Sequence, residues 1–203
     1  MKHSAIILAG GFSKKFEQDK GLIPLANKPL IKYVLEAVTP IADEIIVVLN
    51  SKAQANIYSK ILENVKAVIV DLPINGPLVS AVTGFKTASG EYGLLLPCDT
   101  PLVSQEVLRL LLELCVNRNA VIPRWTNGYI EPLQAVYRVK PALEAAKNAL
   151  KEGKSDMRSM IEKLRGIRYI STLVIQQLDP ELKTFFKIRT PLDLKKAEQM
   201  LKS

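Results

Sequence analysis

The chain has 203 residues, of which 48% are hydrophobic and 24% charged, a composition typical of soluble globular proteins. This length predicts a single domain over residues 1–203, long enough to bury a full core without disulfides, metals or an obligatory partner. The net charge is +8, but the basic residues are dispersed and have no aromatic cluster beside them. That pattern argues against nucleic acid as a partner and leaves an anionic small molecule or a solvated surface as explanations.

Nothing in the sequence indicates export or membrane insertion. The longest apolar runs, at residues 5–9, 45–49 and 94–97, fall far short of the about 20 residues that a membrane-spanning helix needs. The N-terminus lacks a signal-peptide cleavage pattern. Cys98 and Cys115 form no C-x-x-C pair and lie in apolar settings, which predicts free thiols and no structural zinc. We therefore expect a cytoplasmic protein with no membrane partner.

Strand-like and helix-like stretches alternate through the first 120 residues. Four β-branched runs are each followed by a helical pattern: 4–9 then 30–41, 44–49 then 53–62, 67–70 then 78–88, and 92–97 then 103–117. Pro29 is expected to open the first helix, and Thr100 with Pro101 to cap and open the fourth. The strands are continuously apolar, as in a sheet with helices on both faces. The prediction is an α/β fold with a mostly parallel sheet.

The last third of the chain is less regular. Strands are predicted at 120–123 and 133–137, with a turn at Gly128 between them, and helices at 141–151, 157–164 and 192–201. No repeat, linker or low-complexity tract separates this part from the rest. A second domain is therefore not predicted.

A glycine-rich loop follows the first strand, and residues 8–20 read LAGGFSKKFEQDK. Gly10 and Gly11 allow backbone amides to approach a ligand and to donate to phosphate oxygens, and Lys20 adds a point charge. The spacing matches neither the P-loop nor the dinucleotide-binding fingerprint. A plain turn would also explain a glycine pair. The position of this loop after a strand of an open α/β sheet favours a phosphate site, because ligands bind beyond the carboxyl ends of such strands.

Polar side chains follow the other strands of the predicted sheet. Asn50, Asp71 and Asp99 each come directly after a strand, so we expect them at the same edge of the sheet. Asp99 follows the most apolar strand and could hold Mg²⁺ together with substrate phosphates, although capping of the next helix is an equal alternative. Gly76 and Pro77 open a helix whose free amides could face a ligand, or they form a plain turn.

These residues resemble the molybdenum cofactor guanylyltransferase family, whose pattern is a strand followed by L-A-G-G-x-S-x-R-x-G-x-D-K. The loop matches at residues 8–11, Ser13 and 19–20. The resemblance continues in order along nearly the whole chain through Asn50, Asp71, Gly76-Pro77-Leu78, Pro97-Cys98-Asp99, Glu131-Pro132-Leu133, Thr190-Pro191 and Asp193-Leu194. Sugar-phosphate and cytidylyl relatives end the loop with proline-lysine, so the Asp-Lys ending resembles the guanylyl branch.

The resemblance implies a Rossmann-like three-layer sandwich with a mostly parallel central sheet, of the nucleotide-diphospho-sugar-transferase type. The implied reaction transfers GMP from GTP to the phosphate of molybdopterin, with Mg²⁺ as cofactor, and gives the guanine dinucleotide cofactor and pyrophosphate. GTP and molybdopterin are the implied substrates. Other proteins of cofactor biosynthesis or of molybdoenzyme maturation are further partners that the resemblance allows.

The same resemblance assigns site residues. Lys20 and Asp99 are expected to be catalytic, and Asp99 to bind the metal. The expected substrate-binding residues are Leu8, Ala9 and Asp71 for the guanosine, Gly10, Gly11 and Lys20 for the phosphates, and Asn50, Gly76, Pro77 and Asp99 beside them. The only histidine, His3, precedes the first strand, so Ser-His-Asp catalysis and histidine-rich metal sites are not expected.

Five positions depart from the family pattern. Lys15 replaces an arginine, Glu17 and Ser80 replace glycines, and Lys187 and Arg189 stand where N-x-N-T-P is expected. Lysine keeps the charge of arginine but loses its planar fork of donors. An acidic side chain at 17 would repel a triphosphate unless it points away.

Two alternatives remain at this point. The first is a related nucleotidyltransferase that uses CTP or another phosphate acceptor. The second is a nucleotide-binding carrier with weakened catalysis, which Glu17, Lys187 and Arg189 favour and the presence of Lys20 and Asp99 opposes.

Overall fold

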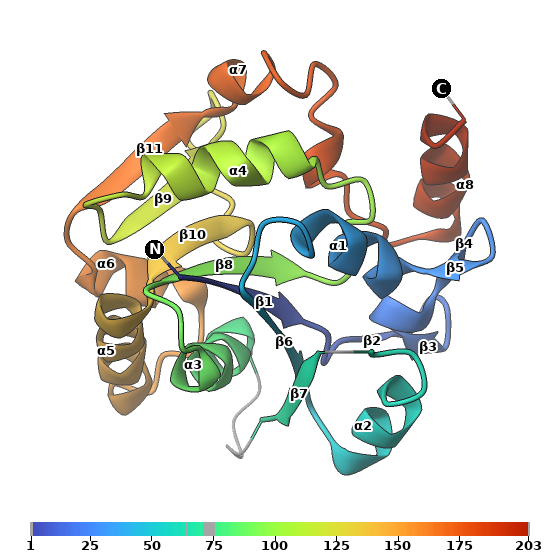
Figure 1. Ribbon diagram of the computed structural model, residues 1–203, viewed down its shortest axis with the longest axis horizontal. Coiled ribbons are helices and arrows are strands. Elements are labelled where there is room, and N and C mark those ends of the chain that lie inside the picture. The colour runs from blue at the N-terminus through green and yellow to red at the C-terminus, as the bar shows by residue number, and fades with distance from the viewer. Residues whose placement is uncertain (1, 64, 71–75, 203) are drawn as a thin grey trace.

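A central sheet organises the computed structural model, which describes residues 2–63, 65–70 and 76–202 (Figure 1). Over these residues the sheet has seven strands in the order β11-β9-β10-β8-β1-β6-β7. The strands are β1 (His3–Leu8), β6 (Glu44–Leu49), β7 (Lys66–Ile69), β8 (Tyr92–Pro97), β9 (Ala120–Arg124), β10 (Ala135–Arg138) and β11 (Ile167–Ser171). The pairs β1–β6, β1–β8, β6–β7 and β9–β11 are parallel, whereas β10 is antiparallel to both β8 and β9. The predicted mostly parallel sheet is confirmed.

Helices cover both faces of this sheet, as the continuously apolar strands predicted. One face is covered by α1 (Leu30–Val38) and α4 (Gln105–Leu114), and the other by α3 (Pro77–Thr87), α5 (Val139–Lys151) and α6 (Met157–Lys163) (Figure 1). The remaining helical elements lie at the edges and ends: η1 (Lys20–Leu22), α2 (Lys52–Tyr58), α7 (Thr172–Ile175), η2 (Lys183–Phe185) and α8 (Pro191–Met200). The result is a three-layer sandwich.

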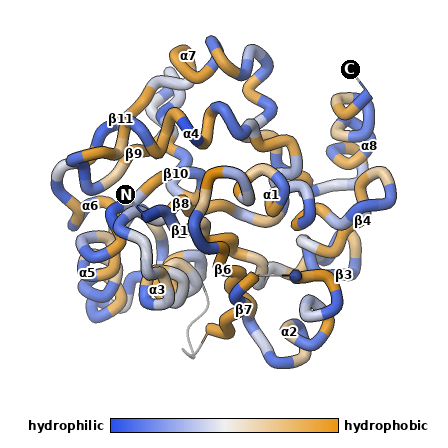
Figure 2. Tube along the Cα trace, in the orientation of Figure 1, coloured by the Kyte–Doolittle hydropathy of each residue, from blue (hydrophilic) through white to orange (hydrophobic). Residues whose placement is uncertain are grey.

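Successive strand residues point to opposite faces and so enter different cores. In β1, Ile7 packs in the core beneath α1 and α4, whereas Ile6 packs in the core beneath α3 and α5. In Figure 2 the strands at the centre of the molecule are accordingly the most hydrophobic stretches, whereas the helices alternate between hydrophobic and hydrophilic residues. The two cores hold the carboxyl ends of β1 and β8 in fixed register, with Leu8 beside Pro97.

Helix starts differ from the sequence prediction at two prolines. α1 begins at Leu30, where the predicted helical stretch begins, but Pro29 is the residue before the helix and lies in a short strand, so it does not open the helix as expected. The prediction that Thr100 and Pro101 cap and open α4 was wrong. Ser104 caps α4 by accepting a hydrogen bond from the Val107 amide, and Thr100 donates to the Pro97 carbonyl within a turn.

Several short elements were not predicted. They are the hairpin strands β2 (Phe12–Ser13), β3 (Gln18–Asp19), β4 (Pro24–Leu25) and β5 (Lys28–Pro29), together with β11, α7 and the two 3-10 turns. Strands of two residues carry no readable periodicity, and pairing across a short hairpin forms them. Within the described ranges, every helix is too short or too polar to cross a bilayer.

Candidate functional site

The site lies where the strand order reverses. From β1 the chain moves to β6 and β7 on one side, and then crosses to β8 on the other side of β1. In open α/β sheets the carboxyl ends of strands at such a switch point border the ligand crevice. Here the Cys98 amide donates to the Leu8 carbonyl at 3.2 Å, and a cavity of about 710 Å³ opens beyond the two strand ends. Predicted residues that line it are Leu8, Gly10, Gly11, Lys20, Asn50, Gly76, Pro77 and Asp99.

A hairpin brings Lys20 back to the glycine pair. Strands β2 and β3 pair antiparallel, and the Lys20 amide then donates to the Gly11 carbonyl at 2.9 Å. The loop is therefore closed, and a lysine nine residues beyond Gly11 in sequence lies beside it in space. Both Gly11 and Lys20 face the cavity, as a phosphate cradle requires.

Asn50 holds the glycine loop from the end of β6. Its side-chain Nδ2 donates to the Gly10 carbonyl at 2.6 Å, and its backbone amide donates to Gln54 Oε1 at 2.8 Å. A Cβ on Gly10 would overlap the Asn50 amide group, so glycine is the residue that permits this approach. Asn50 lines the cavity as predicted, and it also anchors the loop.

Lys20 and Asp99 form an ion pair in the cavity wall. Lys20 Nζ lies 3.1 Å from Asp99 Oδ2, and the side chains are 35% and 8% exposed. Burial of a lone carboxylate would be costly, so the lysine is the partner that stabilises it. The ammonium group keeps two further N–H donors for a ligand oxygen. The two predicted catalytic residues therefore lie together.

The start of α3 also reaches the cavity. Gly76 precedes the helix with φ of 147°, a backbone conformation that favours glycine, and a Cβ there would lie 2.7 Å from the Ser155 carbonyl oxygen. Pro77 takes the first helical position, where its missing amide costs nothing. Helix N-termini present free amides to anions, and Gly76, Pro77 and Ser80 all line the cavity.

One predicted residue, Ala9, does not line the cavity. Ala9 is fully buried and does not line the cavity; its amide donates to the Val48 carbonyl, and its carbonyl accepts from Gln54 Nε2. Because Ala9 does not line the cavity, the structure does not support the expected contact between Ala9 and guanosine. Asp71 lies outside the described residues.

Glu17, where the family pattern has glycine, is not among the residues that line the cavity. It is exposed, does not line the cavity and has φ of 53°. This left-handed conformation accounts for a glycine in the family pattern, because glycine adopts it without strain. The expected repulsion of a triphosphate therefore does not arise from this placement.

Other lining residues were not predicted as site residues. They are Phe12, Val70, Val79, Ser80, Pro97, Cys98, Tyr129, Leu133, Lys187 and Arg189. Phe12 and Tyr129 are 60% and 52% exposed, which is unusual for large aromatic side chains and consistent with ligand contact. Pro97, Cys98 and Leu133 belong to motifs already noted in the sequence, and Ser80 to a departure from one. For Phe12 and Tyr129 the sequence carried no signal, because their loops meet the cavity only after the sheet is assembled. Lys187 and Arg189 were visible as departures from a family motif.

Cys98 lines the cavity without offering a nucleophile. It is 2% exposed, and burial raises the pKa of its thiol far above the usual range, with the neighbouring Asp99 carboxylate adding to the effect. The group therefore remains a thiol at neutral pH. Over the described part of the chain, no three His, Cys, Asp or Glu side chains group as a metal cluster. A divalent cation would need Asp99 and ligand oxygens.

The fold and the cavity together define a nucleotide-binding α/β protein, with a glycine loop, a lysine and a carboxylate at the switch point of a mostly parallel sheet. Residues 5–167 match the MobA-like NTP transferase domain, and the chain belongs to this family.

Relatives match over nearly the full chain. A probable molybdenum cofactor guanylyltransferase from Methanothermobacter thermautotrophicus is 33% identical over 200 residues, covering 95% of this chain and 97% of the relative. A molybdenum cofactor guanylyltransferase from Desulfosudis oleivorans is 30% identical, with 98% and 96% covered. Among solved structures, molybdopterin-guanine dinucleotide biosynthesis protein A from Archaeoglobus fulgidus superposes with a TM-score of 0.84 at 26% identity, covering 98% of each chain.

Similarity of fold extends further than this family. The 2-C-methyl-D-erythritol 4-phosphate cytidylyltransferase from Thermus thermophilus superposes with a TM-score of 0.71 at 20% identity over both full chains. The predicted nucleotidyltransferase fold is confirmed.

Proposed function

We propose that this protein transfers GMP from GTP to the phosphate of molybdopterin, forming the guanine dinucleotide cofactor and pyrophosphate. The observation that carries the proposal is the Lys20–Asp99 pair beside the glycine loop, within one cavity at the switch point. The names of relatives at 30–33% identity supply the nucleotide and the acceptor.

The glycine loop and Lys20 bind the phosphates of the nucleotide in this proposal. Backbone amides of a glycine-rich loop match phosphate oxygens, and the hairpin fixes Lys20 beside them at no further cost during the reaction. Lys20 also neutralises charge that develops on the departing pyrophosphate.

Asp99 would hold Mg²⁺ in the same arrangement. Magnesium takes one or two carboxylates and completes its shell with water and substrate phosphates, so a single carboxylate in the wall fits it. When bound, the cation supplies charge neutralisation to the phosphate oxygens. Lys20 Nζ lies 3.1 Å from Asp99 Oδ2, so a cation held by Asp99 would neutralise phosphate charge together with Lys20.

Direct transfer is the mechanism that these side chains favour. An oxygen of the acceptor phosphate forms a bond to the α-phosphorus of GTP, and the bond from that phosphorus to the bridging oxygen breaks. The electron pair leaves with pyrophosphate. The buried Cys98 stays protonated and offers no thiolate for a covalent intermediate, and in this proposal the protein acts by positioning and charge neutralisation.

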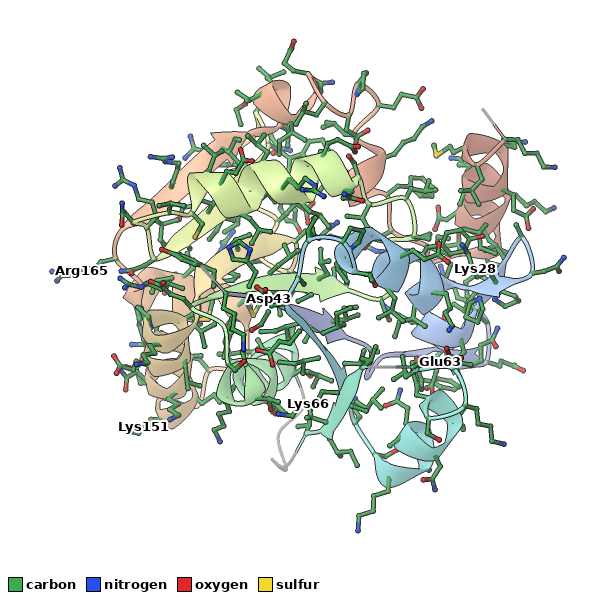
Figure 3. All side chains as sticks on the ribbon, in the orientation of Figure 1. Lys28, Asp43, Glu63, Lys66, Lys151 and Arg165 are labelled. Atoms are coloured by element: carbon green, nitrogen blue, oxygen red, sulfur yellow. The ribbon has the colours of Figure 1, made fainter. Side chains whose placement is uncertain are left out.

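The proposal is tested by pyrophosphate release with GTP, Mg²⁺ and molybdopterin. Asp99→Asn keeps the size of the side chain but removes its charge, and we expect turnover to fall by about 10²–10³, the cost of removing one preorganised electrostatic group. Asp43→Asn is the control, since Asp43 precedes β6 at the opposite edge of the sheet and accepts a hydrogen bond from the His3 amide (Figure 3). Turnover in Asp99→Asn equal to that of the control would refute the assignment.

Competition between nucleotides tests the base. We expect GTP to displace a fluorescent GTP analogue at lower concentration than CTP does. Preference for CTP would retain the fold and the transfer chemistry but change the nucleotide.

A further inference from the structure

The hydrogen-bond ladder between β1 and β6 is interrupted where it reaches the glycine loop. Its last direct bond joins the Ala9 amide to the Val48 carbonyl at 2.9 Å, in the parallel register that places Leu8 beside Val48. In a regular parallel ladder of this register, the next bond would join the Asn50 amide to the Ala9 carbonyl. Here a side chain lies between these two backbone groups.

The carboxamide of Gln54, on α2, bridges the interrupted position. Its Nε2 donates to the Ala9 carbonyl at 3.0 Å, and its Oε1 accepts from the Asn50 amide at 2.8 Å. A carboxamide suits this place because it carries a donor at one end and an acceptor at the other. Both backbone groups are therefore satisfied, and the inserted side chain holds the ends of β1 and β6 apart.

Gln54 acts on the cavity only through other residues. It is 6% exposed and does not line the cavity, whereas Gly10 and Asn50, which follow the two bridged strands, do. Without the carboxamide, the Ala9 carbonyl and the Asn50 amide would either lose their partners or bond directly to each other. Direct bonding would draw Asn50 toward β1 and disturb the bond from Asn50 Nδ2 to the Gly10 carbonyl.

Helix α2 fixes Gln54 and also contacts the far end of the loop. Ser51 caps this helix by accepting a hydrogen bond from the Gln54 amide at 3.1 Å. At the other end of the helix, Tyr58 is fully buried in the core beneath α1 and α4. Its hydroxyl lies against Gly21, where a Cβ would come within 2.5 Å of the hydroxyl oxygen. Helix α2 therefore contacts the chain just before the glycine pair and just after Lys20.

We propose that Gln54 is a positioning residue for the nucleotide phosphates, because its carboxamide replaces one bond of the sheet and so sets the spacing between Gly10 and Asn50. The identity of the nucleotide, GTP, rests on the proposed function. The positioning role rests on the two hydrogen bonds of the carboxamide.

Calorimetric titration with Mg²⁺ and a non-hydrolysable GTP analogue tests this role without turnover. Gln54→Met keeps the length of the side chain and removes both hydrogen bonds. We expect the Kd for the analogue to rise about tenfold, the loss expected for two hydrogen bonds of ordinary net strength. In the transfer assay the KM for GTP should rise in parallel with little change in kcat, because Lys20 and Asp99 keep their ion pair.

Ser4→Ala is the matched control in the same strand. Ser4 is fully buried, and its hydroxyl also takes part in two hydrogen bonds, from the Gly90 amide and to Glu44, at the opposite end of β1. This variant should lose a comparable part of the free energy of unfolding in urea and bind the analogue as the wild type does. Equal weakening of analogue binding in Ser4→Ala and Gln54→Met would assign the effect to general destabilisation and overturn the inference.

Gln54→Asn keeps the test decisive if Gln54→Met does not fold. It retains a carboxamide, but the side chain is one methylene shorter and too short to bridge both backbone groups. We expect a smaller loss of analogue affinity than in Gln54→Met. Wild-type affinity in Gln54→Asn would overturn the inference.

Separate outcomes test the inference and the proposed function. Wild-type affinity for the analogue in Gln54→Met would overturn the positioning role, whatever reaction the protein performs. A fall in kcat with an unchanged KM for GTP would also overturn it, because that result would assign Gln54 to the chemical step. Weaker analogue binding by Gln54→Met, together with a wild-type protein that transfers no GMP to molybdopterin, would keep the positioning role and change the reaction.

Discussion

The contact between Gly10 and Asn50 leads to a quantitative prediction about nucleotide binding. Asn50 Nδ2 donates to the Gly10 carbonyl at 2.6 Å, and a Cβ at position 10 would lie 2.7 Å from that same nitrogen. In Gly10→Ala the Asn50 side chain must swing away, which breaks the hydrogen bond. Asn50→Ala breaks the same bond directly. The two substitutions therefore remove one shared interaction.

The net contribution of one hydrogen bond is about 0.5–1.5 kcal/mol, and the loop becomes less rigid when this bond is lost. Each single variant should therefore bind GTP about two- to tenfold more weakly. The double variant should be no weaker than either single one, because the alanine Cβ occupies space that the amide has left. The cycle then gives a coupling energy of about 1 kcal/mol. Binding of a GTP analogue by isothermal titration calorimetry measures all four Kd values.

Additive losses in the double variant would contradict this reasoning, since they would show that the Cβ and the amide disturb the loop independently. A Gly10→Ala variant with wild-type affinity would also contradict it. Ser13→Ala is a control in the same loop, at a buried position that does not line the cavity.

Three further predictions concern stability and reactivity. A Cβ on Gly84 in α3 would overlap Ile6 of β1, so Gly84→Ala should lower the free energy of unfolding in urea by about 1–3 kcal/mol despite the better helix propensity of alanine; a gain in stability would show that the two elements separate easily. Burial raises the pKa of the Glu44 carboxyl, but hydrogen bonds from Ser4, Ser89 and Gly90 lower it by more, so its folded pKa lies below the ordinary value. The stabilisation by the Glu44 carboxylate is complete above the unfolded pKa of about 4.3 and is lost as pH falls through the lower, folded pKa. The free energy of unfolding in urea should therefore favour the wild type over Glu44→Gln at neutral pH and less so below about pH 4.3. A difference between the two proteins that does not change with pH would contradict the lowered pKa. Burial also raises the pKa of Cys115 to about 12 and that of Cys98 further, so iodoacetamide at neutral pH should label neither thiol until the chain unfolds, and rapid labelling of the native protein would show that the cavity wall opens.

The central strands could be predicted from the sequence because each one is marked by a continuous apolar run of neighbouring residues. Residues 44–49 and 92–97 coincide with β6 and β8, since continuous apolar runs describe buried parallel strands well. The hairpin that returns Lys20 to Gly11 carried no such signal: its strands have two residues each, and pairing across the loop forms them. The prediction that Lys20 joins the glycines in a phosphate site depended on the residue types of the loop, on its place after a strand and on the family motif, rather than on periodicity.

The sequence predicted the site residues that follow strands, but not those that reach the cavity from loops far along the chain. Gly10, Asn50 and Asp99 follow strands directly, so a parallel sheet already brings them to one edge. Tyr129 and Arg189 reach the cavity from loops whose course depends on tertiary packing, including the bond from Ile188 to Asp99. No local pattern encodes such contacts. Ser104 likewise replaced Thr100 as the cap of α4, because a turn after Asp99 delays the helix.

Product analysis tests the central claim most directly. The purified protein is incubated with GTP, Mg²⁺ and molybdopterin, and the products are separated by chromatography and identified by mass. We expect pyrophosphate and molybdopterin-guanine dinucleotide in equal amounts, with the yield of both from Asp99→Asn lower by about 10²–10³ over the same time. Formation of the cytosine dinucleotide from CTP in preference, or transfer of GMP to a different phosphate acceptor but not to molybdopterin, would contradict the proposed function.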